Sequence, residues 1–78
     1  MSDIGDRIRT LISRNLSVAE EAVVPTARLI EDLGADSLDA VELVISLEDE
    51  FAVQLTDDQV ASIRTVGDAV DLVGKVAA

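Results

Sequence analysis

The sequence predicts an all-α protein: a four-helix bundle of three longer helices and one short helix, with a long loop between helices one and two. Three observations favour this fold class. Apolar residues make up 49% of the chain with a single aromatic, which suits a core of branched aliphatic side chains. They recur at helical spacings in several stretches, and no segment alternates in the period-two pattern of a strand. With 78 residues, positions 1–78 predict one domain.

The first helix is expected to run from Ile4 to about Leu16. Ile4, Ile8, Leu11 and Ile12 recur at spacings that place them on one helical face. Ser2 is a residue type that caps helix starts, so we expect it to cap this one.

The stretch from Ser17 to Asp36 shows no clear period, and Pro25 and Gly34 punctuate it. A connection of this length is unusual in a small domain and such loops are often functional. Gly34 is expected to make a turn, after which Asp36 or Ser37 caps the next helix. Five apolar side chains are expected to hold the loop against the helices: Val18, Val23, Leu29, Ile30 and Leu33.

Helix two is expected from Ser37 to Glu50, followed by a short link from Phe51 to Leu55. Thr56 and Gln59 match a capping box and predict a short third helix carrying Val60 and Ile63. Thr65 and Asp68 have the same spacing and predict the start of the fourth helix. Its apolar face comprises Val66, Ala69, Val70, Val73 and Val76.

Charge and composition exclude several classes of function. Sixteen acidic against six basic residues give a net charge of −10, which repels nucleic acids and anionic membranes, discourages self-association and suits basic protein partners. We therefore expect a monomer. The chain has no Cys and no His, which excludes disulfides, Cys/His zinc sites and catalytic triads.

The remaining sequence signals for ions and membranes are weak. Clusters of carboxylates do not fit a calcium-binding EF-hand loop, so we interpret them as solvated faces and expect no metal site. No apolar run approaches the length of a membrane span, and the polar N-terminus does not resemble a secretory signal. We expect a cytoplasmic protein with no membrane insertion.

Helix two has apolar residues on two sides. On a helical wheel, Ala40, Leu43, Val44, Leu47 and Phe51 fall within one arc, which is an ordinary core stripe. Leu38, Val41 and Ile45 lie more than a quarter turn from the centre of that arc, flanked by Glu42 and Asp49 on one side and Glu48 on the other. One interpretation is that helix two buries both faces. The other is a docking surface, because apolar patches rimmed by polar groups mark partner sites.

Ser37 stands at the start of this helix. A serine after an aspartate is most often a helix cap. No base that could activate it as a nucleophile lies nearby, and Ala35 and Asp39 occupy the glycine positions of a G-x-S-x-G elbow. If Ser37 takes part in chemistry, another protein must perform it, so the chain itself is not expected to be an enzyme and no catalytic residue is assigned.

The run from Glu31 to Asp39 (EDLGADSLD), followed by Val41-Glu42-Leu43 and by Leu47 to Phe51 (LEDEF), resembles the signature of bacterial acyl carrier proteins. The similarity extends from Ile4 to about Val76. Some positions depart from the common pattern of that family, among them Leu29, Ile45, Ala52 and Gln54.

The resemblance implies that Ser37 carries 4'-phosphopantetheine, attached covalently from coenzyme A by a magnesium-dependent phosphopantetheinyl transferase. It implies that Asp36, Leu38 and Asp39 surround this site and that the two aspartates help the transferase. It implies a docking surface for acyl-processing enzymes with basic patches, formed by Leu38, Val41, Glu42, Ile45, Glu48 and Asp49. An acyl chain would lie between the helices, for which Leu43, Leu47, Leu55, Ile63 and Ala69 are the expected lining.

The function that this resemblance implies is a carrier of acyl thioesters in fatty acid biosynthesis. A carrier of the same fold for a specialised pathway, such as polyketide or modified-lipid synthesis, is the alternative. A helical interaction module without a prosthetic group is a third interpretation, which the mass of the loaded protein would separate from the other two.

Overall fold

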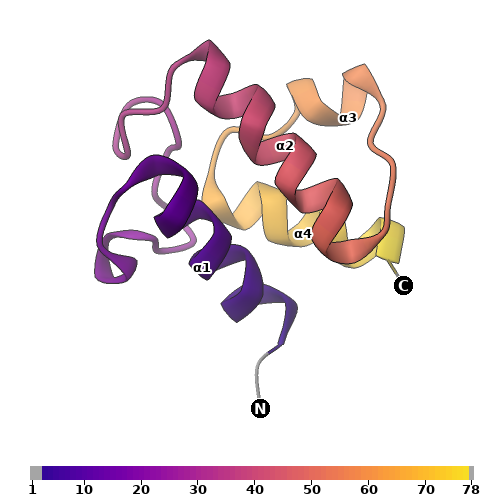
Figure 1. The fold of residues 1–78 in the computed structure, drawn as a ribbon, viewed down its shortest axis with the longest axis horizontal. Coiled ribbons are helices and arrows are strands. Elements are labelled where there is room, and N and C mark those ends of the chain that lie inside the picture. Colours follow the sequence, from indigo (N-terminus) through magenta and orange to yellow (C-terminus); the bar gives the residue numbers. More distant parts are fainter. Residues whose placement is uncertain (1–2, 78) are drawn as a thin grey trace.

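The structure, a computed structural model, describes residues 3–77 and contains four α-helices in that range (Figure 1). They are α1 (Ile4–Leu16), α2 (Ser37–Phe51), α3 (Asp57–Ala61) and α4 (Val66–Ala77). A single 3-10 turn, Glu20–Ala22, lies in the long connection between α1 and α2. The predicted fold class is confirmed: three longer helices, one short helix and a long first loop.

Helix α1 begins at Ile4 as expected, but its cap is one residue later than the sequence suggested. Asp3 is the cap, because its Oδ1 accepts a hydrogen bond from the Asp6 amide at 2.8 Å. Ser2, the expected cap, lies outside the described residues. The helix ends at Leu16, and the following Ser17 adopts a left-handed conformation with φ of 55°.

Helix α2 is closed at its start by a reciprocal capping box. The Asp39 amide donates to Asp36 Oδ1 at 2.8 Å, and the Asp36 amide donates to Asp39 Oδ2 at 3.2 Å. Two of the amides at the helix start are thereby satisfied by side chains. The helix includes Phe51, one residue beyond the expected end, and Ala52 then turns into the left-handed region with φ of 54°.

The third and fourth helices begin at the predicted capping residues. Thr56 and Gln59 form the capping box of α3, and Thr65 and Asp68 exchange hydrogen bonds at the start of α4. The expectation that α3 would carry Ile63 is wrong. The helix ends at Ala61, and Ile63 lies in the link to α4, where its amide still bonds the Val60 carbonyl at 3.1 Å.

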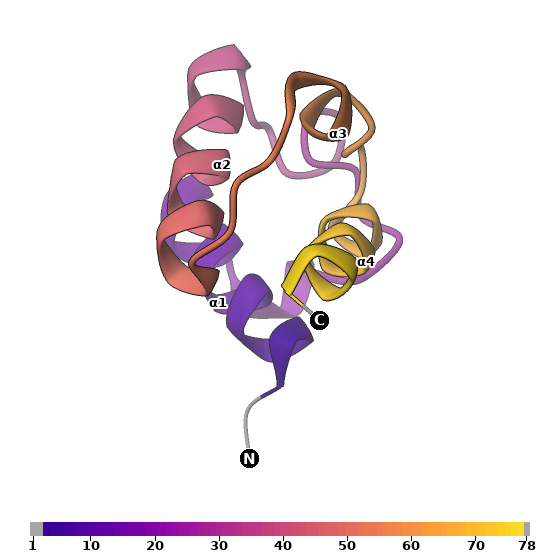
Figure 2. The same cartoon turned by 90° about the vertical axis from the view of Figure 1, so that its right-hand side faces the viewer.

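The core lies where α1, α2 and α4 meet. Figure 2 shows α3 and α4 on the side of the molecule opposite α2, and α1 contacts both α2 and α4. The most deeply buried side chains come from these three helices: Ile8, Ile12, Leu47, Ala69 and Val73. No helix among residues 3–77 is long and apolar enough to cross a bilayer.

The long loop is joined to the start of α4 by backbone hydrogen bonds, and we call this contact the loop–helix junction. The Leu29 amide donates to the Arg64 carbonyl at 3.0 Å, the Val66 amide to the Ala27 carbonyl at 3.0 Å, and the Gly67 amide to the Pro25 carbonyl at 2.9 Å. A β-carbon on Gly67 would lie 3.0 Å from that Pro25 oxygen, so the junction leaves little room for a side chain there. The junction fixes the path of the chain that leads to α2.

Most of the apolar residues expected to hold the loop do so. Val23, Leu29 and Leu33 are buried, and Val18 packs against the core. Ile30 is 60% exposed, so its expected role is wrong. The loop turns tightly after Arg28, whose carbonyl accepts the amides of Asp32 and Leu33. Leu29 and Leu33 take the inward positions of this turn, which leaves Ile30 on its outer side.

Candidate functional site

Ser37 is the first residue of α2 and its side chain is exposed. Asp36, not Ser37, caps the helix. The hydroxyl of Ser37 makes no hydrogen bond within residues 3–77, so the folded chain leaves it available to another molecule. The capping interpretation of Ser37 is therefore wrong, because the preceding aspartate already occupies that role.

The position of Ser37 on the helix places it between two different surfaces. At about 100° per residue, Ser37 lies roughly 60° from Ala40 and roughly 40° from Val41 around the helix axis. Ala40 belongs to the inward side of α2 and is half-buried, whereas Val41 is exposed. A group attached to Ser37 can therefore reach either surface.

The outer face of α2, formed by Leu38, Val41 and Ile45, is apolar and exposed. These side chains are 65%, 56% and 52% exposed, whereas Leu43 and Leu47 on the inward side are 3% and 1% exposed. The interpretation that helix two buries both faces is therefore wrong for residues 3–77. Glu42 and Asp49 beside the outer face are also exposed, so its apolar centre has an acidic border.

Glu48, which the sequence assigns to the same border, also has a structural contact. Its Oε2 accepts a hydrogen bond from the Leu55 amide at 2.9 Å and so holds the link between α2 and α3. The side chain is half-buried. Sequence reasoning missed this contact because it joins residues seven positions apart across an irregular segment.

A groove runs along the inward side of α2. Its mouth has a volume of about 380 Å³ and its inner end a volume of about 40 Å³. Leu29, Ala40 and Ile63 line both parts, so the two adjoin each other. The mouth is further lined by Arg28, Ile30, Glu31, Arg64, Thr65 and Asp68, and the inner end by Leu43, Val44, Leu47 and Val60.

The groove brings together only part of the expected acyl lining. Leu43, Leu47 and Ile63 line the inner end. Ala69 lies in the core with no exposed surface. Leu55 lies beside a separate depression together with Glu48 and Val53. Ala40 and Val44 could have been found from the inward stripe of α2, but no sequence signal pointed to Arg28 and Arg64, which come from two separate loops.

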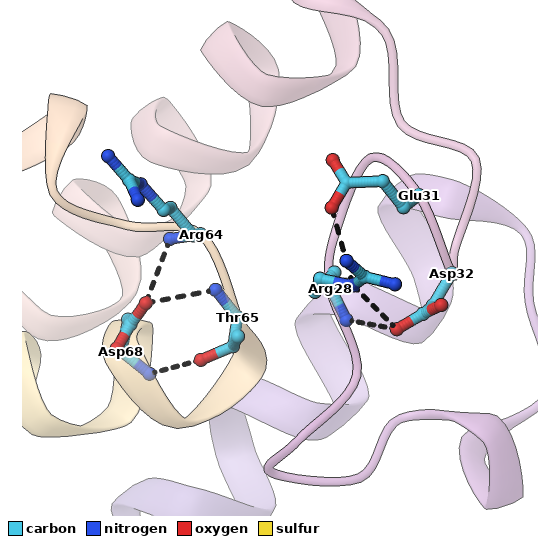
Figure 3. A network of polar contacts seen from close by, with 6 residues as sticks. All are labelled: Arg28, Glu31, Asp32, Arg64, Thr65 and Asp68. Atoms are coloured by element: carbon cyan, nitrogen blue, oxygen red, sulfur yellow. Dashed lines mark hydrogen bonds and ion pairs between the residues drawn. The ribbon is translucent and has the colours of Figure 1, made fainter.

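Two carboxylates hold the loops around the groove mouth (Figure 3). Asp32 Oδ2 accepts from the Arg28 amide at 2.8 Å, and this hydrogen bond, assisted by the guanidinium of the same residue, lowers the pKa of Asp32. Asp68 Oδ2 accepts from the amides of Arg64 and Thr65, each at 3.1 Å, and these bonds lower the pKa of Asp68. In both cases the hydrogen bonds favour the ionised carboxylate. Each carboxylate in turn holds the backbone of the loop that precedes it in the sequence.

No group of three or more potential metal ligands occurs among residues 3–77.

Residues 6–73 match the family described as "Phosphopantetheine attachment site". The match spans most of the chain, so the protein belongs to this family of acyl carrier proteins, whose members carry acyl groups on covalently bound 4'-phosphopantetheine. The fold is also similar to a solved structure described as "a putative acyl carrier protein" from Mycobacterium tuberculosis. The two are 32% identical, with a TM-score of 0.87 over 94% of this chain and 97% of the other.

The residues present fit the prosthetic group of this family. The exposed hydroxyl of Ser37 lies at the N-terminus of the 15-residue helix α2, where unpaired backbone N–H groups and the helix dipole favour a phosphate. When bound, the prosthetic group supplies a thiol that holds an acyl group as a thioester. The chain itself offers the exposed hydroxyl of Ser37, a groove lined by Ala40 about one turn further along α2, and the exposed outer face of α2.

Proposed function

We propose that this protein carries acyl intermediates as thioesters on 4'-phosphopantetheine attached to Ser37, and that it serves fatty acid biosynthesis. The observation that carries the proposal is the Ser37 hydroxyl, which is exposed and unbonded within residues 3–77 because Asp36 caps the helix in its place. The apolar inner end of the groove supports an acyl cargo, since burying each CH₂ group stabilises by about 0.8 kcal/mol.

We propose further that the outer face of α2 binds the phosphopantetheinyl transferase and the acyl-processing enzymes. Exposed apolar side chains supply the contact area, and the acidic border of Glu42, Glu48 and Asp49 suits partners with basic patches. Asp36 and Asp39, engaged in the capping box, lie beside the anchor and would face the transferase with it. The net charge of −10 supports a monomeric carrier, because copies of the chain repel one another.

The attachment is tested by intact mass spectrometry after incubation with coenzyme A, Mg²⁺ and a phosphopantetheinyl transferase. The wild-type chain is expected to gain the mass of one phosphopantetheine, and Ser37→Ala is expected to gain none while keeping its helical circular dichroism. Ser62→Ala is the matched control. Ser62, the residue after α3, is also exposed, but its hydroxyl donates a hydrogen bond to the Gln59 carbonyl. An unmodified wild-type protein, or modification of the Ser37→Ala variant, would contradict the proposal.

The fatty acid assignment is tested by supplying the loaded protein to purified fatty acid elongation enzymes. We expect the chain on the carrier to lengthen by repeated two-carbon additions, as read by mass spectrometry of the acylated protein. Transfer of the first acyl group without any elongation would favour the specialised-pathway alternative.

A further inference from the structure

The mouth of the groove contains two of the six basic residues of a strongly acidic chain. Arg28 comes from the loop before α2, and Arg64 from the link between α3 and α4 (Figure 3). The loop–helix junction brings these two segments side by side, since Arg28 and Thr65 form an isolated antiparallel bridge. Both arginines therefore line the mouth, which adjoins the apolar inner end.

The two arginines differ in how their side chains are used. Arg28 Nε lies 3.3 Å from Glu31 Oε2 and 3.5 Å from Asp32 Oδ2, so its guanidinium is already paired. The guanidinium of Arg64 has no ion pair or hydrogen bond within residues 3–77. It therefore has all five of its N–H donors available, and an arginine side chain has no acceptor of its own.

The backbone of Arg64 is nevertheless fixed from both sides. Its amide donates to Asp68 Oδ2 at 3.1 Å, and its carbonyl accepts from the Leu29 amide at 3.0 Å. The carboxylates at the mouth are also occupied, because Asp68 binds two amides and Glu31 pairs with Arg28. Arg64 thus lines the mouth from a fixed backbone position, with its guanidinium unpaired within residues 3–77, and the carboxylates that line the same mouth have other partners.

The sizes of the two parts of the groove restrict what fits in each. A water molecule requires a cavity of about 10–15 Å³, so the inner end, at about 40 Å³, has room for only a few heavy atoms. The mouth, at about 380 Å³, is large enough for a short acyl group. Ala40, which lines the mouth, follows Ser37 by three residues, about 4.5 Å along the helix axis. The phosphopantetheine arm separates the thioester from Ser37 by many bonds, so an arm folded back along α2 can place the thioester at the mouth, with the first acyl carbons beside Arg64.

We propose that Arg64 is a specificity-determining residue for the cargo: its guanidinium binds acyl groups that carry an oxygen acceptor on the third carbon, in preference to saturated acyl groups of the same length. This inference rests on the proposed attachment of the cargo at Ser37. A charge-assisted hydrogen bond from an arginine is stronger than one between neutral groups. A 3-oxo or carboxylate oxygen can accept such a bond, whereas a saturated chain leaves the donors to water.

Three thioester forms of similar length test this proposal: butanoyl, 3-oxobutanoyl and malonyl, each loaded on Ser37 from its coenzyme A ester and verified by intact mass. Burial of apolar surface alone predicts that the butanoyl form has the highest melting temperature. We expect instead that both oxygenated forms melt about 2–5 °C above the butanoyl form, the shift that one modest hydrogen bond produces in a domain of this size.

Two variants assign the effect to Arg64. In Arg64→Met, which removes the donors but keeps an unbranched side chain, the order is expected to reverse so that the butanoyl form melts highest. Arg14→Met, which removes an equal charge from an exposed position at the end of α1, is expected to retain the wild-type order. Persistence of the wild-type order in Arg64→Met would overturn the proposal, and so would a gain for the malonyl form alone, which would indicate attraction of charge without an acceptor contact.

A second measurement uses only the wild-type chain. The Nε–Hε resonance of Arg64 is expected to shift between the butanoyl and the 3-oxobutanoyl forms, while that of Arg14 stays unchanged. Equal Arg64 resonances in the two forms would refute the contact even if the variants did not fold. Failure of the attachment is distinguished at the first step, because the mass of the protein would then show no modification at Ser37.

Discussion

Two neighbouring side chains of α2 provide a direct test of which face of the helix maintains the fold and which meets partners. Leu47 is 1% exposed in the core, and Ile45 is 52% exposed on the outer face. Both are four-carbon aliphatic side chains in the interior of the same helix, and their helix propensities differ by much less than the cost of emptying a buried site. Burial is therefore the main difference between the two substitutions.

The expected stabilities follow from the exposed fractions. Removing a fully buried leucine side chain costs about 2–5 kcal/mol, so Leu47→Ala is expected to lower the melting temperature by at least about 8 °C. Ile45 loses at most half of a full burial contribution of about 1.5–3 kcal/mol, and alanine is the better helix former. Ile45→Ala is therefore expected to cost about 1 kcal/mol or less.

The functional effects are expected in the opposite order. Thermal unfolding by circular dichroism measures the stability. The efficiency of docking is measured as the rate of modification by the transferase, followed by intact mass at 20 °C or below. Ile45→Ala is expected to slow modification several-fold, whereas folded Leu47→Ala is modified nearly as fast as wild type. If Ile45→Ala destabilised the fold as much as Leu47→Ala, or left the modification rate unchanged, the assignment of the outer face to partners would be wrong.

Three further outcomes are expected, each read from urea or thermal unfolding. Ala52→Gly should stabilise the protein by about 0.5–1 kcal/mol, because Ala52 occupies the left-handed region at φ of 54° and glycine adopts that conformation without a steric cost. Gly34→Ala should destabilise it by about 1 kcal/mol through backbone strain, since φ is 76° and no atom beyond the adjacent residues lies within 4 Å of the added carbon. An unchanged urea midpoint would contradict this. Asp68→Asn should reduce stability at neutral pH, because the depressed folded-state pKa of Asp68 means that its ionised carboxylate stabilises the fold. The difference from wild type should shrink as the pH falls below 3.8, the ordinary pKa of the group, because protonation removes that contribution. A difference that stays constant from pH 6 to pH 2 would show that the charge of Asp68 does not matter.

Local sequence signals predicted the helices well. The capping pairs Thr56–Gln59 and Thr65–Asp68 gave the starts of α3 and α4, because each pair satisfies amides only a few residues away. The ends were less accurate. Ile63 has helical spacing relative to Val60, yet α3 ends at Ala61. The backbone groups of Arg64 and Val66 bond the long loop instead, in the loop–helix junction. Contacts of that kind join distant segments and leave no periodic pattern.

For the candidate site, too, local features were predicted better than contacts between distant segments. The outer face of α2 followed from helical geometry alone, since Leu38, Val41 and Ile45 recur at spacings that keep them together and away from the core stripe. The groove did not. Leu43 and Leu47 could be placed there from the wheel, but Ala69 has the same apolar character and lies in the closed core. Which apolar side chains border a cavity depends on how helices approach one another, and the sequence pattern records only that they face inward.

The loop–helix junction is made of backbone amides and carbonyls, so it does not depend on the identity of the side chains at Arg28 or Arg64. Those two side chains can therefore be exchanged without changing the path of the main chain. Under the proposed role of Arg64, carriers of this fold could adapt to a new cargo by substitution at that position, while Ser37 and the outer face of α2 stayed unchanged.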